Sequence, residues 1–326
     1  MKIAIAGAGS IGCFCGGLLT HAGHQVTLLG RPRILDPIRK HDLTVTDFSG
    51  MIRTLPASRL ILSDNPLCLA QNDLIIVAVK SAATHEVAKL VADHAPETAP
   101  VLSWQNGLDN AQILRAALPN RDVRAGMVPF NVVPRDTASY HRATSGDIVI
   151  QTGPGDLAQR LNSSDLPVTA SDRIEAVQWG KLIINLNNAL NALSGLTLVE
   201  QLMDSNWRRL MADQMAEALR VLSAAGHPIA STTPLPAWMT PYILRLPTPV
   251  FSRIAARMLT IDPTARTSMA YDLSAGRPTE INSLQGEIIR LGRVTGVATP
   301  ICIRVSQLIS EAPETPLTPA QITGGI

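Results

Sequence analysis

Residues 2–12 read KIAIAGAGSIG, and this stretch decides the fold. A short apolar run, suited to a buried strand, leads into glycines at 7, 9 and 12, and helical spacing begins at residue 10. In a strand–turn–helix unit the first glycine permits the tight turn, the second lets a pyrophosphate approach the backbone, and the third lets helix and strand pack closely. The alternative is an ordinary glycine-rich turn. The pattern predicts that a dinucleotide binds here, on Gly7, Ala8, Gly9, Ser10, Ile11 and Gly12.

The first half of the chain alternates strand-like and helix-like segments. Further apolar runs at 24–30, 72–80 and 99–107 are bounded by turn formers, and helical patterns follow the last two. Such alternation is typical of βαβ units, which form a parallel sheet with helices on both faces. Residues 123–153 are strand-rich, and 166–172 suit a last strand. We therefore predict an α/β fold that begins with a Rossmann-type doubly wound sheet.

After residue 171, long helical patterns replace the strands. We predict a dinucleotide-binding Rossmann domain at 1–171 and an all-helical substrate and catalytic domain at 172–312. A tail at 313–326 lacks apolar periodicity, and we expect it to be poorly ordered. Prolines interrupt 231–250, which makes that stretch a connector. The helical patterns cover 173–194, 206–225, 250–259, 265–275, 279–294 and 299–310.

The composition argues against several classes of partner. The formal net charge is +2, no run of five basic residues occurs, and aromatic residues make up 3% of the chain. These features disfavour nucleic acid and anionic membrane surfaces. No stretch of 18 uninterrupted apolar residues occurs, so we expect no membrane span.

The four cysteines, Cys13, Cys15, Cys68 and Cys302, do not have the spacing of a metal site. We expect no metal, and small buried thiols that suit a reducing cytoplasm.

The end of the second predicted strand indicates which dinucleotide is bound. A fold that selects NAD usually has a carboxylate there, which grips the ribose 2′-hydroxyl. This chain instead reads LLGRPR, with Arg31 at the tip and Arg33 behind it. A guanidinium can bind a 2′-phosphate in bidentate fashion, so NADP is favoured over NAD. The alternative is that Arg31 is a solvated charge at the end of a strand.

Two more predicted strand ends face the same crevice, because ligands of open α/β sheets bind beyond the carboxyl ends of the strands. Lys80 ends VAVKS, and Asn106 stands in SWQNG. Lys80 can add positive charge near the phosphates or a substrate carboxylate. Asn106 can hydrogen-bond the nicotinamide side or the substrate, but Asn-Gly is also a common turn pair.

Residues 179–195, WGKLIINLNNALNALSG, place one lysine and four asparagines in an apolar helix. Lys181, Asn185 and Asn188 share one face, and Asn187 and Asn191 form a second polar pair. A lysine among amides and aliphatic side chains is a candidate for a lowered pKa, and its ammonium could protonate an oxygen as a hydride arrives. The alternative is a snorkelling surface lysine with amides that bridge helices.

Downstream, Pro278-Thr279-Glu280 begins a helix after Gly276, which places a carboxylate near a helix N-terminus. A helix cap is the alternative role for Glu280. Ser268 stands 12 residues earlier, in a run that is otherwise helical.

Taken together, these residues resemble the ketopantoate reductase family (2-dehydropantoate 2-reductase) over about residues 1–310. The resemblance rests on KIAIAGAGSIG, GR at 30–31, VAVKS, QNG, WGKLIIN and RTSMAYDLSAGRPTEIN, in that order. It implies a Rossmann domain and a helical domain with the active site between them. It also implies NADPH-dependent reduction of 2-dehydropantoate to D-pantoate, a step of pantothenate and coenzyme A synthesis.

The resemblance also implies a role for each site residue. The glycines hold the pyrophosphate, Arg31 and Lys80 favour NADP, and Asn106 lies by the nicotinamide. Lys181 is the general acid toward the ketone oxygen. The residues that bind substrate are Asn185, Ser268 and Glu280. The carboxylate of Glu280 also positions the lysine.

One position departs from the family pattern K-x-x-x-N-x-x-x-N. Ala189 stands where the second asparagine is expected, and Asn188 is beside it. Our hypothesis is that Asn188 supplies the missing amide from a slightly rotated place. The connector at 231–250 also looks long, which bears on the pocket or on contact between the subunits of a possible homodimer.

Two other functions remain open. One is a paralogous NADPH-dependent reductase of another 2-oxo acid or an imine. The other is a non-catalytic NADP-binding redox sensor, although a sensor has no need of the proton donor that Lys181 and Glu280 suggest.

Overall fold

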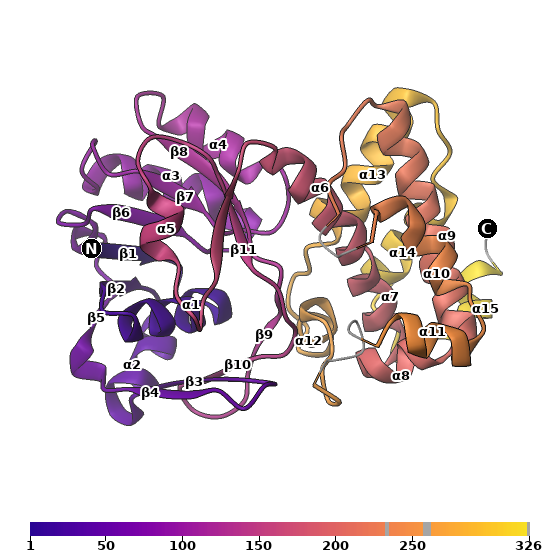
Figure 1. Cartoon of the computed structure of the whole chain (residues 1–326), viewed down its shortest axis with the longest axis horizontal. Helices are drawn as coiled ribbons and strands as arrows, with labels where there is room; N and C mark the ends of the chain where they lie inside the picture. The colour runs from indigo at the N-terminus through magenta and orange to yellow at the C-terminus, as the bar shows by residue number, and fades with distance from the viewer. Residues whose placement is uncertain (232–234, 257–261, 325–326) are drawn as a thin grey trace. The chain divides into compact units, whose positions relative to one another are not determined.

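The computed structural model describes residues 1–231, 235–256 and 262–324. The chain divides into two compact units, Met1–Ile174 and Glu175–Ile326. Figure 1 shows strands and helices in the first unit and helices in the second.

An eight-stranded sheet forms the centre of the first unit, in the order β12-β11-β8-β7-β6-β1-β2-β5. Six neighbouring strands, from β5 to β8, are parallel, and in chain order they run 3-2-1-4-5-6, the order of a dinucleotide-binding Rossmann sheet. The predicted doubly wound sheet is confirmed. The strands are β1 (Lys2–Ala6), β2 (Gln25–Leu29), β5 (Leu60–Ser63), β6 (Leu74–Val77), β7 (Val101–Ser103), β8 (Val123–Met127), β11 (Ile148–Gln151) and β12 (Val168–Ser171).

Both faces of this sheet are buried, as the continuous apolar strands require. In β1, Ile3 and Ile5 belong to a core that includes residues of α1 (Ser10–His21), whereas Ala4 and Ala6 belong to another with residues of α3 and α4. The alternation follows from the two-residue period of a strand. The other helices of this unit are α2 (Pro32–His41), α3 (Thr84–His94), α4 (Asn110–Ala117) and α5 (Leu157–Leu161).

A second, four-stranded sheet packs beside α1, and the sequence did not lead us to expect it. Its order is β4-β3-β10-β9, and β3 pairs in parallel with β10, a strand 95 residues away along the chain. The strand-rich segment 123–153 is thus shared between two sheets. The strands are β3 (Leu43–Asp47), β4 (Ile52–Leu55), β9 (Val132–Pro134) and β10 (Ser139–Arg142).

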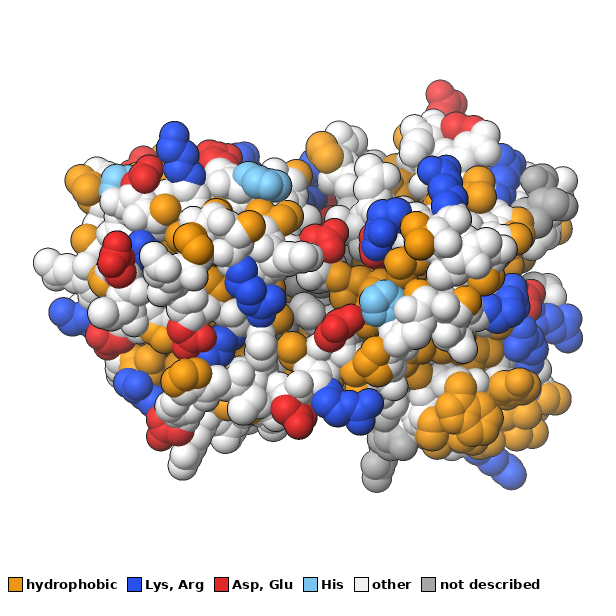
Figure 2. Space-filling view, turned by 90° about the horizontal axis from the view of Figure 1, so that it is seen from above, with side chains coloured by type: hydrophobic (Ala, Val, Ile, Leu, Met, Phe, Trp, Pro, Cys, Tyr) orange, Lys and Arg blue, Asp and Glu red, His pale blue; other side chains and the backbone are white. Residues whose placement is uncertain are grey.

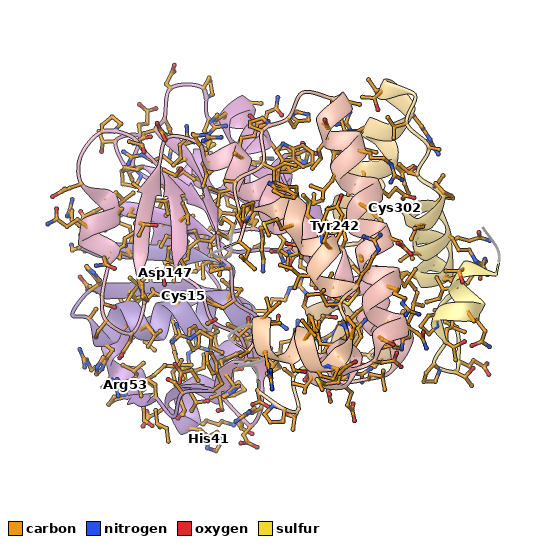
Figure 3. All side chains as sticks on the ribbon, turned by 45° about the vertical axis from the view of Figure 1, so that its right-hand side comes forward. Cys15, His41, Arg53, Asp147, Tyr242 and Cys302 are labelled. Carbon is orange, nitrogen blue, oxygen red and sulfur yellow. The ribbon has the colours of Figure 1, made fainter. Side chains whose placement is uncertain are left out.

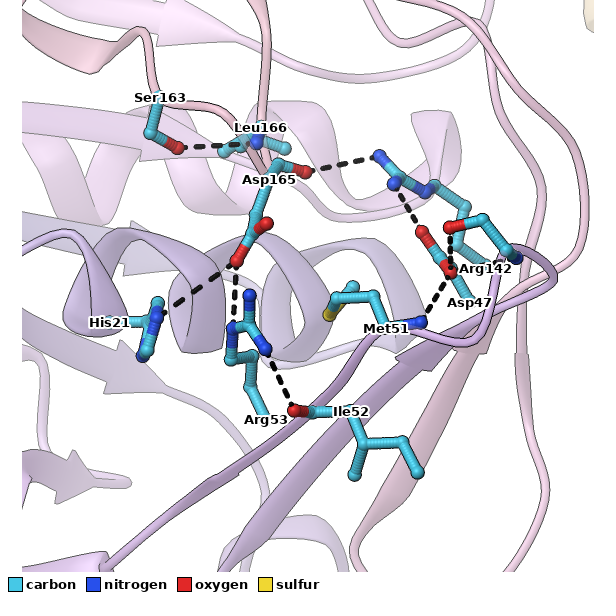
Figure 4. Close-up of polar contacts among 10 residues, drawn as sticks. His21, Asp47, Met51, Ile52, Arg53, Arg142, Ser163, Asp165 and Leu166 are labelled. Atoms are coloured by element: carbon cyan, nitrogen blue, oxygen red, sulfur yellow. Dashed lines mark hydrogen bonds and ion pairs between the residues drawn. The ribbon is translucent and has the colours of Figure 1, made fainter.

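Ion pairs link strands of this second sheet to one another and to its surroundings (Figure 4). Arg142 Nη2 lies 2.6 Å from Asp47 Oδ2, which ties β10 to β3. Arg53 Nε lies 2.8 Å from Asp165 Oδ2, and His21 Nε2 lies 3.9 Å from the same oxygen. Asp165 therefore links β4 and the end of α1 to the loop before β12.

The elements assigned to the described residues after β12 are all helical, as predicted, and the fold class is confirmed. Residues 257–259 of the predicted helix 250–259, and 232–234 of the connector, lie outside the described residues. The helices are α6 (Ile174–Asn185), α7 (Asn187–Ser194), α8 (Leu198–Met203), α9 (Ser205–Ala224), α10 (Thr240–Leu244), α11 (Thr248–Ile254), α12 (Ser268–Ser274), α13 (Ile281–Thr295), α14 (Pro300–Glu311) and α15 (Pro319–Thr323).

The C-terminal tail contains a short helix, where the sequence led us to expect poor order over 313–326. Thr318 and Gln321 form a capping box at the start of α15. Ile322 is fully buried, and Leu317 N donates a hydrogen bond to Leu193 O at 2.8 Å. A single buried side chain and one backbone contact anchor the segment, and apolar periodicity does not detect either feature.

Three of the four cysteines are buried, and Cys68 is half-buried. Burial raises the pKa of the Cys13 thiol to about 12, which makes it a poor nucleophile. Figure 3 labels Cys15 in the first unit and Cys302 in the second. Across the described ranges, no cluster of His, Cys, Asp and Glu suits a metal ion. No helix in the same ranges is long and apolar enough to cross a membrane.

Candidate functional site

The glycine turn after β1 has a geometry that other residues cannot adopt. Gly7 has φ +120°, and a Cβ at Gly12 would lie 2.1 Å from Gly7 O. The N–H groups of Gly7 and Ala8 both donate to Leu29 O, at 3.0 Å each, which holds the turn against the end of β2. Two glycines of the motif are therefore explained by the protein's own packing.

Gly9 is different, because packing within the protein does not explain it. A Cβ at this position would meet only Ala78 O, 4.0 Å away. Gly9 is the N-cap of α1, whose first turn contains no acidic residue, so its unpaired N–H groups and the helix dipole favour an anion. Open space beside a helix N-terminus is what a bound pyrophosphate requires, so this turn fits the phosphates of a dinucleotide.

Strand order places this turn at the switch point of the sheet. β1 lies between β2 and β6, so the loops after β1 and β6 leave the sheet side by side. A Cβ at Gly7 would lie 2.8 Å from Val79 N. Lys80 is exposed and directly precedes the 3₁₀ turn η3 (Ser81–Ala83). Its charge therefore lies on the loop beside the glycine turn.

Arg31 lies at the other side of the turn, after β2. A Cβ at Gly30 would lie 2.4 Å from Ala8 Cβ, so this strand end touches the glycine turn. Arg31 is exposed, and its guanidinium makes no hydrogen bond or ion pair with any residue that the structure describes. Arg33 is also exposed. Two guanidinium groups thus follow the strand end where NAD-selective folds have a carboxylate.

Asn106 is exposed in the loop after β7, and the predicted turn is present because Gly107 has φ +90°. The Asn106 carbonyl accepts hydrogen bonds from Ser81 Oγ at 3.0 Å and from Asn110 Nδ2 at 2.6 Å. The bond from Ser81 joins the loop after β7 to the loop that carries Lys80.

A buried polar network behind this loop was not found by sequence reasoning. Gln105 Nε2 donates to Thr84 Oγ1 at 2.7 Å, and Thr84 Oγ1 donates to Asn110 Oδ1 at 2.7 Å. All three side chains are buried. The only signal in the sequence is that polar residues cluster after two adjacent buried strands, in KSAAT and SWQNGLDN. The network fixes the loop that presents Asn106.

In the helical unit, two of the four asparagines are structural. Asn187 exchanges two hydrogen bonds with Gln201 of α8, at 3.1 and 3.2 Å. Asn191 donates to Gln201 Oε1 at 3.1 Å and accepts from Thr267 N at 3.0 Å. This pair therefore bridges helices, as the alternative interpretation held.

The other two asparagines have unused amides. Asn185 is 8% exposed and Asn188 is half-buried. Neither side chain hydrogen-bonds to any residue in the described ranges. A mostly buried amide without a partner loses free energy, so it either serves a ligand or binds water. Asn185 and Asn188 are three positions apart, which is one helical turn, and they carry unsatisfied donors and acceptors on one side of α6 and α7.

Lys181 lies one turn before Asn185 on α6 and is half-buried. Burial lowers the pKa of its ammonium from 10.5 to about 8. A snorkelling lysine keeps its ammonium in water and escapes such a shift. Lys181 therefore has the acidity expected of a proton donor near neutral pH.

The start of α12 is hydrogen-bonded to α7, which together with α6 carries the four asparagines and is called the asparagine helix below. Thr267, the N-cap of α12, donates from Oγ1 to Asn188 O at 3.0 Å. This contact places Ser268, the first residue of α12, beside α7. The Ser268 hydroxyl makes no hydrogen bond with a described residue.

Glu280 directly precedes α13 and is half-buried. Its carboxylate makes no capping hydrogen bond, although it occupies the N-cap position. The alternative role of a helix cap is therefore not what the side chain does. The same helix reaches the asparagines through Gln285, which donates to Leu186 O at 2.8 Å.

The predicted site residues thus form two groups, each within one unit. The glycine turn, Arg31, Lys80 and Asn106 belong to the first unit, on loops that leave β1, β2, β6 and β7. The second group belongs to the helical unit, on α6, α7, α12 and the start of α13: Lys181, Asn185, Asn188, Ser268 and Glu280.

Comparison with known families shows which family this sequence matches. The sequence matches "Ketopantoate reductase PanE/ApbA" over residues 3–155 and "Ketopantoate reductase PanE/ApbA C terminal" over residues 173–312. The chain belongs to the ketopantoate reductase family. As a ketopantoate reductase family member it is an oxidoreductase.

Curated ketopantoate reductases match over almost their whole length. The chain is 26% identical to the 2-dehydropantoate 2-reductase of Halobacterium salinarum, with 95% of this chain and 98% of that one covered. It is 26% identical to the enzyme of the same name from Pyrococcus horikoshii, with 92% and 94% covered.

Solved structures share this fold. The PanE/ApbA family ketopantoate reductase of Ralstonia eutropha JMP134 superimposes with a TM-score of 0.80 at 30% identity, covering 96% of this chain and 98% of that one. A D-mandelate dehydrogenase bound to NADH and anilino(oxo)acetate has a TM-score of 0.75 at 22% identity, covering 99% and 100%. At that identity the second likeness shows the fold alone.

This ketopantoate reductase family member departs from the expected asparagine pattern at position 189, and the structure shows how Ala189 and Asn188 differ in burial. Ala189, at the departing position, is fully buried, whereas Asn188 is half-buried with an unused amide. The predicted helix 173–194 is also interrupted at Leu186, between Asn185 and Asn188.

Proposed function

We propose that this protein reduces 2-dehydropantoate to D-pantoate with NADPH, in pantothenate and coenzyme A synthesis. The observation that carries the proposal lies on α6, where a lysine with a pKa of about 8 precedes an unused asparagine amide by one turn. Family membership supplies the reaction class, and this pair supplies a proton donor beside a group that can bind a carboxylate or carbonyl.

The Rossmann domain, predicted at 1–171, would hold the cofactor. The backbone of residues 7–12 would bind the pyrophosphate, because the space beside Gly9 is open and the first turn of α1 is free of acidic residues. Arg31 and Lys80 would favour the 2′-phosphate of NADP, and Asn106 would lie by the nicotinamide. When bound, the reduced nicotinamide supplies the hydride that the ketone carbon accepts.

Lys181 would supply the proton. As the ketone carbon gains a hydride, its oxygen gains negative charge, and an ammonium with a pKa near 8 can neutralise that charge. The products are a 2-hydroxy acid and a neutral amine, which takes a proton back from solvent. Glu280 would position the ammonium and engage the substrate; its side chain makes no capping hydrogen bond at the start of α13.

The helical domain, predicted at 172–312, would bind the 2-oxo acid. Asn185, Asn188 and the Ser268 hydroxyl all have unused hydrogen-bonding capacity, and Thr267 ties the last two to each other through the backbone of α7. Amide N–H and hydroxyl groups suit a carboxylate and a carbonyl oxygen. Asn188 would thus supply the amide that position 189 lacks.

A second candidate is reduction of a different 2-oxo acid or an imine. The fold is shared with a D-mandelate dehydrogenase, so the fold alone does not select 2-dehydropantoate. A non-catalytic NADP sensor is the remaining alternative. The lowered pKa of Lys181 disfavours it, because a sensor needs no proton donor near neutral pH.

The proposal is tested by following NADPH oxidation at 340 nm with a panel of 2-oxo acids and imines. We expect 2-dehydropantoate to give the highest kcat/KM. A higher value for another 2-oxo acid would establish the paralogue instead. Tight NADPH binding with no oxidation in the presence of any substrate would establish the sensor.

A further inference from the structure

Two buried glutamines contact the asparagine helix, one through its side chains and the other through its backbone. Gln201 of α8 binds the side chains of Asn187 and Asn191, as described above. Gln285 of α13 instead binds the backbone, because its Nε2 donates to Leu186 O at 2.8 Å. Gln285 is fully buried and lies 99 residues from Leu186 along the chain.

The contact coincides with an interruption of the helix. α6 ends at Asn185 and α7 begins at Asn187, although Leu186 keeps helical angles of φ −56° and ψ −29°. Leu186 N still donates to Leu182 O at 3.0 Å. A side chain that inserts into the backbone hydrogen-bond ladder is a known cause of such breaks, and Gln285 provides one at the Leu186 carbonyl.

The interruption lies between the two asparagines whose amides are unused. Asn185 is the last residue of α6, and Asn188 is the second residue of α7. Any rotation of α7 against α6 at Leu186 changes the angle between these two side chains. The hydrogen bond from Gln285 can therefore affect the angle between the two amides, although Gln285 contacts neither of them.

Stability alone does not account for a glutamine at this position. Gln285 Oε1 is buried and accepts no hydrogen bond from the residues that the structure describes. A buried acceptor without a partner costs free energy, and native proteins keep few of them. An apolar side chain of similar length would avoid that cost but would lose the bond to Leu186.

We propose that Gln285 is a positioning residue for the substrate. By holding the Leu186 carbonyl, it sets the rotation of α7 against α6 and so the spacing of the Asn185 and Asn188 amides that receive the 2-oxo acid. This inference rests on the proposed function, because it names the device that orients the same site.

The main test compares Gln285→Met with Gln214→Met. Gln214 is 1% exposed on α9, and its Nε2 has no partner among the described residues, so it controls for removing a buried amide. We expect Gln285→Met to raise the KM for the best 2-oxo acid about tenfold, the upper end of the effect of one lost hydrogen bond. The KM for NADPH should stay within about twofold. Unchanged KM for the 2-oxo acid in folded Gln285→Met would overturn the proposal.

Gln285→Glu gives a second test with a pH readout. A carboxylate cannot donate to the Leu186 carbonyl, but a protonated carboxyl group can, and burial raises the pKa of a carboxyl group toward neutral. The ratio of its KM to that of the wild type should therefore fall as the pH is lowered from 8 to 6. A constant ratio would contradict a role for the hydrogen bond, and this variant decides the question if Gln285→Met folds poorly.

The side-chain amide NMR signals of protein labelled with ¹⁵N-asparagine provide a readout that needs no turnover. The signals of Asn185 and Asn188, assigned with Asn→Asp variants, should shift in Gln285→Met and stay in place in Gln214→Met. Fixed signals would overturn the inference whatever the kinetics. If the wild type reduces no 2-oxo acid, the proposed function fails, and these signals still decide whether Gln285 positions the amides.

Discussion

Lys181 carries the chemistry of the proposed reaction at the scale of a single residue. We expect Lys181→Ala to lower kcat/KM by at least about 10²-fold, the low end for loss of a general acid, with NADPH affinity nearly unchanged. Steady-state kinetics and fluorescence titration with NADPH measure the two quantities. Lys89→Ala, at an exposed position of α3, is the control. Loss of NADPH binding in Lys181→Ala would place the lysine on the cofactor instead.

The pKa of Lys181 also predicts a pH profile. Reduction needs the ammonium, so kcat/KM should be level below pH 8 and should fall about tenfold per unit above it, as the amine loses its proton. The reverse oxidation needs the neutral amine and should rise as the pH approaches 8. Initial rates in both directions between pH 6 and 10 measure this. A level reduction profile up to pH 10 is incompatible with Lys181 as the acid.

Arg31 decides cofactor choice if it binds the 2′-phosphate. Arg31→Ala should then weaken NADPH by roughly 10–100-fold, the range of one or two charge-assisted hydrogen bonds, and leave NADH nearly unaffected. Dissociation constants for both cofactors give the comparison, with Lys40→Ala, at an exposed position of the helix that follows Arg31, as control. Equal weakening of NADPH and NADH would mean that Arg31 does not distinguish them.

At the scale of elements, a helix can be capped by a residue far away in the sequence. α14 begins with Pro300, and Thr299 makes no side-chain cap. Glu217 of α9 caps it instead, accepting from Ile301 N at 3.0 Å and Cys302 N at 2.9 Å. The carboxylate is 1% exposed, so α9 and α14 are joined through a buried charge.

Glu217→Ala would leave both N–H groups without an acceptor. We expect it to lower the free energy of unfolding by about 3 kcal/mol, from the loss of charge-assisted hydrogen bonds and desolvated donors. Urea denaturation followed by circular dichroism measures this. Asp36→Ala, which removes an exposed ion pair with Arg39, should cost under about 1 kcal/mol. Similar losses in the two variants would show that the cap contributes little.

At the scale of the whole molecule, an exposed apolar region of the helical unit predicts a contact with another chain. Figure 2 shows apolar side chains gathered at one end of the helical unit. The two exposed aromatic residues among those described, Trp238 and Tyr242, stack edge to face with centroids 6.3 Å apart, and Tyr242 is labelled in Figure 3. Exposed aromatic clusters of this kind mark interaction surfaces.

We expect this surface to join two copies of the chain. The variant with both Trp238→Ser and Tyr242→Ser should then sediment as a monomer under conditions in which the wild type is a dimer. Ile52→Ser, at a 64% exposed position of β4, should leave the dimer intact. Sedimentation equilibrium measures the masses. A wild type that is monomeric at micromolar concentration, or a dimer that survives the double substitution, would refute the expectation.

Local sequence patterns were enough to predict much of this molecule. The glycine turn after β1 was predictable because its strand, turn and helix are consecutive, and the positive φ of Gly7 and the close approach of Gly12 to Gly7 O arise within them. Strand–helix alternation predicted the Rossmann-type sheet for the same reason. The helical second half followed from periodicity alone. The pairing of β3 with β10 was missed, because nothing within a strand of five residues specifies a partner 95 residues away.

The sequence by itself determined that Lys181, Asn185 and Asn188 share one face of a helix, because helical geometry sets that spacing. Only the tertiary structure decided which asparagines hold helices together. Gln201 and Thr267 hydrogen-bond to Asn187 and Asn191. The side-chain amides of Asn185 and Asn188 make no hydrogen bond with a described residue. The tertiary structure also decided that Gln285, 99 residues away, binds the Leu186 carbonyl at the point where the helix is interrupted. Hydrogen bonds between distant segments form only once the chain has folded, so local pattern carries no record of them.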